Sequence, residues 1–310
     1  MRSLYNALMR HVLIASAVTG AVITATALAA GRHVRAQDTP TFQSGVDLVS
    51  VTATVTDRSG RFVSGLTKDD FTIFEDGRRR DVLRLADEST SVSLGILLDA
   101  SGSIGPAKLR LARESISRLI TNDLDQRAEW FFARFGYSLV VTQEWTTDRA
   151  AIVQPLREVR TTGDTALYDA VALAVPIAES GHFEKKALLV VSDGGETKSL
   201  LSLAMVQESI GESDVRVYAI GVDGADARRG ERLNMNTLRH LTDETGGSAE
   251  TVSDTASIRA ASARLAAELR HQYLLTYSTD ARKDGRTHAI RVEVRGTGLA
   301  VRARKGFVAD

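Results

Sequence analysis

Three short polar segments combine carboxylates with hydroxyls at positions where strands are expected to end. The first is the motif Asp99-x-Ser101-x-Ser103, which closes a continuous apolar run. The second segment contains Thr165, and the third contains Asp193. Together they supply two carboxylates and three hydroxyls. Such an all-oxygen donor set suits a hard divalent cation, with Mg²⁺ preferred and Mn²⁺ or Ca²⁺ next.

A cation held in this way would keep part of its coordination sphere open. Mg²⁺ prefers six near-octahedral ligands and commonly retains several waters. Because neutral hydroxyls leave the ion strongly electrophilic, a carboxylate from a partner protein could complete the shell. Taken alone, the first segment is better explained by helix capping, and Thr165 and Asp193 match an ordinary N-cap and an Asp-Gly turn. The five residues in this order favour the metal site.

The elements that must position these residues lie in the segment 91–270. Apolar strand patterns alternate there with amphipathic helix patterns, which predicts a doubly wound, mostly parallel α/β sheet. Strands are expected at 92–98, 130–135, 139–143, 187–191 and 215–222, and helices at 106–121, 165–178, 200–210, 233–245 and 255–270. Ligands of such sheets bind outside the carboxyl ends of the strands. The three polar segments are expected at that edge.

The order of these elements and motifs resembles the von Willebrand factor A (VWFA) domain, a Rossmann-like fold. The metal-ion-dependent adhesion site (MIDAS) of that family has the pattern Asp-x-Ser-x-Ser, then Thr, then Asp. The resemblance implies that Asp99, Ser101 and Ser103 match its first element, Thr165 its second and Asp193 its third. It also implies that the hydroxyls reach the cation directly or through water, and that an acidic side chain of a protein ligand closes the shell.

One position departs from the family pattern. Asp164 precedes the threonine, where such domains often have glycine. An extra carboxylate at this position would either tighten cation binding or repel an acidic ligand, and the sequence leaves both alternatives open.

Enzyme motifs are missing from the sequence. There is no Gly-x-Ser-x-Gly elbow, no phosphate-binding Gly-x₄-Gly-Lys-[Ser/Thr] loop and no His-Glu-x-x-His motif. The leading hypothesis is a non-enzymatic, metal-dependent protein-binding or adhesion module. The alternatives are a metal-dependent phosphate or ester hydrolase, and a structural envelope protein whose cation only ties the three loops together.

Period-2 alternation predicts β-strands before the α/β segment, in residues 46–90. Val49–Val55 alternates apolar with hydroxyl residues, and Phe71–Phe74 leads into an Asp76-Gly77 turn. Such a turn is a strong hairpin signal, with Val82–Leu85 as the expected return strand.

Strands are also expected after the α/β segment, in residues 271–310. Asp284-Gly285 offers another hairpin-like turn there, and Tyr273 and Tyr277 are expected in the core. Each flank has too few strands for a sandwich of its own, so we predict that both pair into one β-sandwich around the inserted domain. The flanks resemble, less specifically, those of a group of bacterial exported proteins with a related A domain.

The N-terminus has the pattern of an export signal. Arg2 and Arg10 precede a charge-free run at 12–30 that ends near small residues. We predict a signal peptide over 1–36 and a polar linker over 37–45, with an uncleaved N-terminal membrane anchor at 12–30 as the alternative. Both predict a periplasmic or extracellular location.

Composition excludes several classes of protein. The 310 residues include 39 basic and 39 acidic side chains and no cysteine. The missing cysteines exclude a disulfide framework and thiolate metal sites, and the charge balance argues against a nucleic-acid partner. Without residues 1–36, which hold four arginines and no acid, the net charge becomes about −4. Membrane contact is expected only through the N-terminal anchor alternative.

Overall fold

The computed structural model describes residues 47–86, 91–124, 127–224 and 232–309. The predicted signal peptide, its anchor alternative and the linker lie outside these residues. Among the helices in these four ranges, none is long and apolar enough to cross a membrane.

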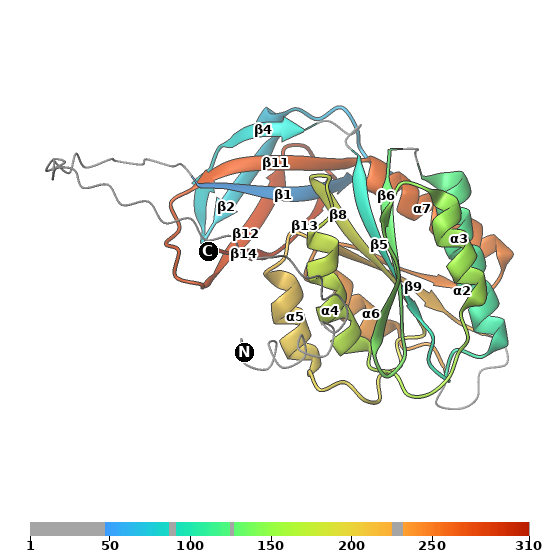
Figure 1. The fold of residues 1–310 in the computed structure, drawn as a ribbon. Helices are drawn as coiled ribbons and strands as arrows, with labels where there is room; N and C mark the ends of the chain where they lie inside the picture. Colours follow the sequence, from blue (N-terminus) through green and yellow to red (C-terminus); the bar gives the residue numbers. More distant parts are fainter. Residues whose placement is uncertain (1–46, 87–90, 125–126, 225–231, 310) are drawn as a thin grey trace, which may run out of the picture. The chain divides into compact units, whose positions relative to one another are not determined.

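A six-stranded sheet forms the centre of the α/β part (Figure 1). Its strand order is β10-β9-β8-β5-β6-β7, and all neighbours are parallel except β7, which runs antiparallel to β6. The strands are β5 (Val92–Asp99), β6 (Glu129–Phe135), β7 (Leu139–Thr146), β8 (Lys185–Ser192), β9 (Arg216–Val222) and β10 (Ala249–Val252). Every residue of β5 is buried, because both faces of the sheet are covered.

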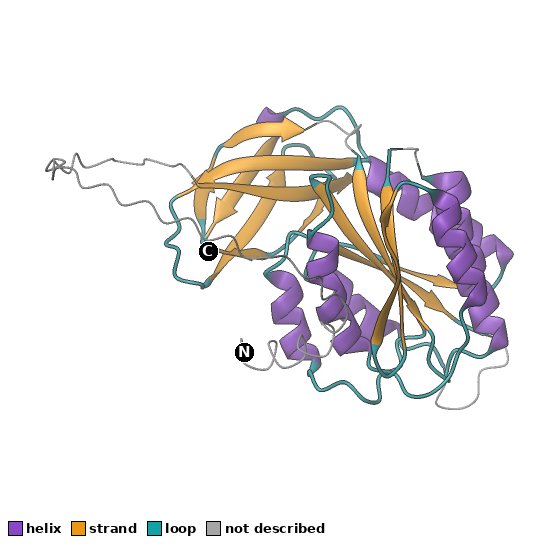
Figure 2. Ribbon diagram, in the orientation of Figure 1, coloured by secondary structure: helices purple, strands orange, loops and turns teal. Residues whose placement is uncertain are grey.

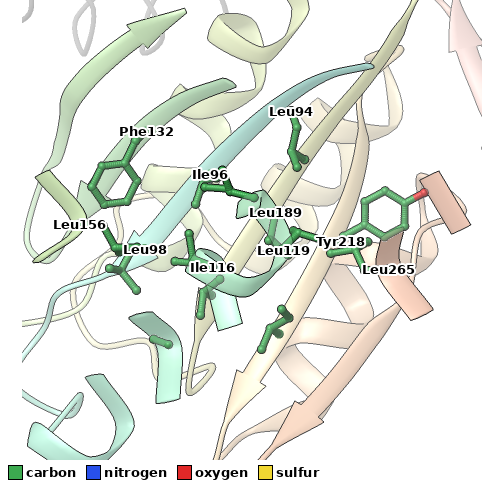
Figure 3. Close-up of a cluster of buried hydrophobic side chains, with 14 of the residues drawn as sticks. Leu94, Ile96, Leu98, Ile116, Leu119, Phe132, Leu156, Leu189, Tyr218 and Leu265 are labelled. Atoms are coloured by element: carbon green, nitrogen blue, oxygen red, sulfur yellow. The ribbon is translucent and has the colours of Figure 1, made fainter. Parts of the chain in front are cut away.

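Helices cover both faces of this sheet (Figure 2). They are α2 (Pro106–Arg118), α3 (Arg149–Glu158), α4 (Leu167–Glu179), α5 (Leu203–Gly211), α6 (Met235–Asp243) and α7 (Thr255–Arg270), and the π-helix η2 (Leu119–Asp123) continues α2. Side chains of α2, α3 and α7 pack on one face of the sheet. Those of α4, α5 and α6 pack on the other. Alternate β5 residues Leu94, Ile96 and Leu98 point into the first of these cores (Figure 3).

The remaining strands form two four-stranded sheets, ordered β13-β1-β11-β4 and β14-β12-β2-β3. Their bounds are β1 (Asp47–Thr56), β2 (Phe71–Glu75), β3 (Arg78–Arg80), β4 (Val82–Ala86), β11 (Gln272–Thr279), β12 (Thr287–Val294), β13 (Ala300–Ala303) and β14 (Gly306–Val308), with the 3₁₀ helix η1 (Lys68–Asp70) before β2. Both sheets share one apolar core, which includes Tyr273 and Tyr277 as predicted.

Each of these two sheets combines strands from both ends of the chain. The predicted fold class, a doubly wound α/β domain flanked by a sandwich of N- and C-terminal strands, is therefore confirmed. The domain bounds 46–90, 91–270 and 271–310 stay predictions.

Both hairpin predictions in the sandwich are wrong in detail. Asp76 and Gly77 turn the chain with φ of 48° and 79°, as a tight hairpin requires, but the return strand is β3. Val82–Ala86 pairs instead with β11 in the other sheet. The strand β3 consists of three arginines at a sheet edge, so no apolar alternation in the sequence predicts it. The second turn, Asp284-Gly285, joins β11 to β12, which lie in different sheets.

Several helices begin later than their apolar periodicity predicts. The helix α4 begins at Leu167 rather than 165, and α5 begins at Leu203 rather than 200. The residues just before each helix are held in loops by side-chain hydrogen bonds, as Leu200 and Leu201 are by Asp169. The short elements α3, β10 and β14 have no counterpart in the predicted elements.

Candidate metal site

The loops with the five predicted residues meet at one edge of the six-stranded sheet. The strands β5 and β8 are parallel neighbours, and Leu98 pairs with Val191. Asp99 is the last residue of β5 and Asp193 directly follows β8, so the two aspartates lie side by side. The loop with Thr165 is tied to the loop after β5 by backbone hydrogen bonds. In these, Gly102 N donates to Gly163 O at 2.9 Å, and Thr162 N donates to Ala100 O at 2.9 Å.

Asp99 is fully buried, and protein donors occupy both of its carboxylate oxygens. Oδ1 accepts from the Ser101 backbone N at 2.9 Å, and Oδ2 accepts from Ser192 Oγ at 2.6 Å. Burial raises the pKa of the Asp99 carboxyl to about 6, and the nearby charge of Asp193 adds to this effect. A charged Asp99 is thus costly unless a positive charge lies close to it.

The serine hydroxyls and the Asp193 carboxylate share a small space beside Gly195. Ser101 Oγ and Ser103 Oγ are 3.2 Å apart. A Cβ added to Gly195 would lie 3.0 Å from Asp193 Oδ1 and 3.7 Å from Ser103 Oγ, so both oxygens approach the same point. Asp193 Oδ1 also accepts from Gly195 N at 3.0 Å. The geometry therefore brings together oxygen donors of two loops.

The loop after β8 holds Thr165 in place. The Thr165 backbone N donates to Thr197 Oγ1 at 3.0 Å, and its carbonyl accepts from the backbone N of Thr197 and Lys198. The Glu196 carboxylate ties the same loop to the start of α4, where Tyr168 N donates to Oε2 at 3.2 Å. Thr165 is buried, and these hydrogen bonds hold its backbone in place.

Asp164, the departure from the family pattern, lies at the surface. Its carboxylate is 4.0 Å from the ammonium of Lys198, and both side chains are exposed. The structure therefore places this extra carboxylate in solvent beside a lysine.

Sequence reasoning missed two residues of the site. Lys108, on the first turn of α2, places Nζ 2.7 Å from Asp193 Oδ2 and 3.2 Å from Ser103 O. Ser192 donates to Asp99 and accepts from Gly194 N at 2.9 Å. The sequence offers one weak signal for Lys108, because it precedes the apolar residues Leu111 and Ala112 by three and four positions and so shares their helix face.

The donor set fits a hard divalent cation. Two buried carboxylates from different loops and the adjacent hydroxyls of Ser101 and Ser103 supply oxygen only. Within the residues that the structure describes, no group of three or more His, Cys, Asp or Glu side chains is arranged to hold a metal. A cation here would thus depend on the hydroxyls and on water.

A sequence model of one domain family matches most of the α/β part of the chain. The von Willebrand factor type A domain model aligns with residues 93–264, more than half of the chain. The chain belongs to the von Willebrand factor type A (VWA) family. The predicted resemblance is thereby confirmed, and the match includes all five predicted site residues.

Relatives of this VWA chain include a human protein and bacterial proteins of known structure. Integrin alpha-E of Homo sapiens is 29% identical over an alignment of 154 residues; the match covers 46% of this chain and only 13% of that protein. A von Willebrand factor type A structure from Catenulispora acidiphila matches 86% of this chain and 74% of its own, with a TM-score of 0.51 and 14% identity.

A second bacterial structure is an aerotolerance-related membrane protein from Bacteroides fragilis NCTC 9343, solved with multiple mutations to serine. It matches 57% of this chain and 98% of its own, with a TM-score of 0.50 and 20% identity. At this level of identity, both bacterial structures show a shared fold.

Proposed function

We propose that this VWA protein is an exported, metal-dependent protein-binding or adhesion module with a MIDAS-type site. Mg²⁺, or in its place Mn²⁺ or Ca²⁺, binds at the loops of the five residues Asp99, Ser101, Ser103, Thr165 and Asp193. An Asp or Glu side chain of a protein partner completes its shell. One observation carries the proposal: at the carboxyl edge of a VWA sheet, the buried carboxylate of Asp193 approaches the adjacent hydroxyls of Ser101 and Ser103 from a separate loop.

The hydroxyl and carboxylate residues of the site have different roles. The hydroxyls of Ser101, Ser103 and Thr165 bind the ion or its waters, while Asp99 and Asp193 orient these ligands and balance charge. The bound ion supplies an electrophile that a carboxylate can reach. Because so much of the donor set is neutral, the ion keeps a strong attraction for an incoming negative charge.

Exposed apolar side chains on neighbouring loops support a protein partner. Tyr137 is 73% exposed and follows Gly136, whose carbonyl accepts a hydrogen bond from Ala166 N beside Thr165. Leu200 is 75% exposed, and its backbone N donates to Asp169 on α4. Large apolar groups around a polar centre suit a protein contact better than a small soluble substrate.

The module is proposed to be non-enzymatic. Histidine is the most frequent general base, and three of the described histidines have partners elsewhere: His182 contacts Glu129, His271 contacts Ser64 and His288 contacts Asp76. The acids of the site are committed to hydrogen bonds with neighbouring donors. Nothing in the part of the chain that the structure describes favours the hydrolase alternative.

Mg²⁺ binding and partner capture test this function together. We expect Ser103→Ala to weaken Mg²⁺ binding in calorimetry, while Ser209→Ala, at a half-buried position on α5, leaves it unchanged. Proteins captured from an envelope extract in Mg²⁺ should be released by chelator and lost with Ser103→Ala. A partner complex that persists unchanged in excess chelator would contradict the proposed function.

Two further measurements separate the alternatives. Phosphate- or ester-bond turnover that disappears with Asp193→Ala would identify a hydrolase. A melting temperature that falls on metal removal while the partner stays bound would identify a purely structural cation.

A further inference from the structure

A buried lysine lies inside the candidate metal site. The side chain of Lys108 is 4% exposed, and its ammonium lies 2.7 Å from Oδ2 of Asp193, which is itself 2% exposed. The ammonium also donates to the carbonyl of Ser103 at 3.2 Å. Lys108 therefore contacts two of the residues proposed to surround the cation.

The position of this ammonium is fixed by packing along its stem. A Cβ added to Gly224, just after β9, would lie 3.0 Å from Lys108 Cγ, so the backbone there closes over the lysine side chain. The residue sits on the first turn of α2, on the face that also buries Leu111 and Ala112. A lysine held in this way cannot swing into solvent without moving its helix or the segment around Gly224.

The contact satisfies two buried charges at once. An isolated ammonium or carboxylate is costly to bury, and removing one member of a buried pair strands the other. Lys108 supplies one positive charge at a site with two buried carboxylates, Asp99 and Asp193. It therefore offsets part of the negative charge that would otherwise attract a divalent ion.

We propose that Lys108 is a built-in counter-cation of the site, which holds Asp193 in place without metal and competes with the divalent ion for it. This inference rests on the proposed metal site and adds the residue that sets its affinity. A divalent cation next to Asp193 would lie close to the ammonium, and like charges at such separations repel strongly. The site should thus bind Mg²⁺ weakly, and its loops should stay ordered in the metal-free protein.

Two lysine substitutions give a matched comparison. Lys108→Met keeps an unbranched apolar stem and removes the buried charge. Lys198→Met removes an exposed charge near the site, because the Lys198 ammonium lies 4.0 Å from the carboxylate of Asp164. Full-length protein of each variant would be titrated with Mg²⁺ by calorimetry and melted with and without chelator.

We expect Lys108→Met to bind Mg²⁺ at least about tenfold more tightly than the wild type. In chelator its melting temperature should fall by about 5 °C or more, because Asp193 loses its partner, and Mg²⁺ should restore most of the loss. Wild-type protein and Lys198→Met should melt at nearly the same temperature with and without the ion.

The outcomes separate this inference from the proposed function. If the wild type binds Mg²⁺ and Lys108→Met binds it no more tightly, the counter-cation role is overturned while the metal site stands. If neither protein binds Mg²⁺, the metal site fails and the inference falls with it. Should Lys108→Met be unfolded in chelator, recovery in Mg²⁺ supports the role. Absence of recovery in both Lys108→Met and Lys108→Gln overturns it.

Discussion

The hydroxyl of Ser192 donates a 2.6 Å hydrogen bond to Oδ2 of Asp99, across the ends of the parallel strands β8 and β5. The Ser192 Oγ atom also accepts a hydrogen bond from Gly194 N at 2.9 Å. One buried hydroxyl thus orients the Asp99 carboxylate and shapes the turn that carries Asp193. This link makes Ser192 a positioning residue for both acids of the site.

Replacing Ser192 with alanine should therefore weaken the fold and the site together. Ser192→Ala removes a donor from Asp99 and an acceptor from Gly194 N, both buried. We expect a loss of about 1–3 kcal/mol in the free energy of unfolding, measured with urea, and weaker Mg²⁺ binding in calorimetry. Ser115→Ala is the matched control, since this buried hydroxyl bonds only its own helix at Leu111 O. Equal effects of both variants would contradict the positioning role.

The five-residue motif could be predicted because the ends of the buried strands are visible in the sequence as the ends of apolar runs. The continuous apolar runs of β5 and β8 end directly at Asp99 and Ser192, so the edge where Asp193 lies follows from topology. Lys108 could not be placed in this way, because a lysine on an amphipathic helix is usually solvated. Its burial depends on the tertiary approach of Asp193, from a loop 85 residues away in the chain.

In the sandwich, strands could be predicted from the sequence but their pairing could not. The sequence patterns predict the strands β1 and β2, but they carry no information about which strands become neighbours. Apolar alternation predicts the return from the Asp76-Gly77 turn at Val82–Leu85, because β3, with its three arginines, lacks apolar residues. Pairing in such sheets depends on contacts more than 200 residues apart, such as Val51 with Leu275.

A close backbone approach provides a second test of the fold. Gly247 lies beside β9, and a Cβ placed there would lie 1.8 Å from the carbonyl oxygen of Val217. Because the obstacle is backbone, Gly247→Ala should cost about 1–3 kcal/mol or more of unfolding free energy. Gly211→Ala, where an added Cβ would meet no atom within 4 Å beyond its own helix backbone and chain neighbours, should be neutral or stabilise by up to about 1 kcal/mol. Urea unfolding distinguishes them, and similar stability for both variants would contradict the packing described.

A buried arginine should couple the α/β part to the sandwich during unfolding. Arg216 on β9 is 2% exposed; its Nη1 donates to Thr54 Oγ1 at 2.6 Å, and its Nη2 donates to the carbonyls of Thr52 and Arg302. These acceptors belong to β1 and β13 of the sandwich. One guanidinium therefore bridges strands of different sheets.

Arg216→Met removes this bridge and should split thermal unfolding into two transitions, or broaden it measurably, in calorimetric melting. Arg216→Lys should give an intermediate result, because a lysine keeps the charge but lacks the planar fork that serves several acceptors. Arg259→Met, at an exposed position on α7, controls for the loss of a positive charge. A single sharp transition for Arg216→Met would contradict the coupling.

The pH dependence of stability should depend in part on Asp70. Its carboxylate accepts hydrogen bonds from the backbone N and the hydroxyl of Thr67, each at 2.8 Å, and from Arg295 at 2.9 Å. These bonds, led by the one from the Thr67 backbone, lower the pKa of Asp70 to about 2. An aspartate in an unfolded chain titrates near 3.9, so below about pH 4 the unfolded state binds more protons than the folded state.

The stabilisation from Asp70 is thus present above about pH 4 and is lost as the pH falls towards 2. Asp70→Asn should lower stability at pH 7, and its stability should fall less steeply than that of the wild type between pH 4 and pH 2. The two proteins should then approach each other near pH 2 in urea unfolding measured across this range. Asp69→Asn, at the exposed neighbouring position, is the matched control for the loss of one negative charge. Parallel stability curves for Asp70→Asn and the wild type would show that these hydrogen bonds do not favour the charged form.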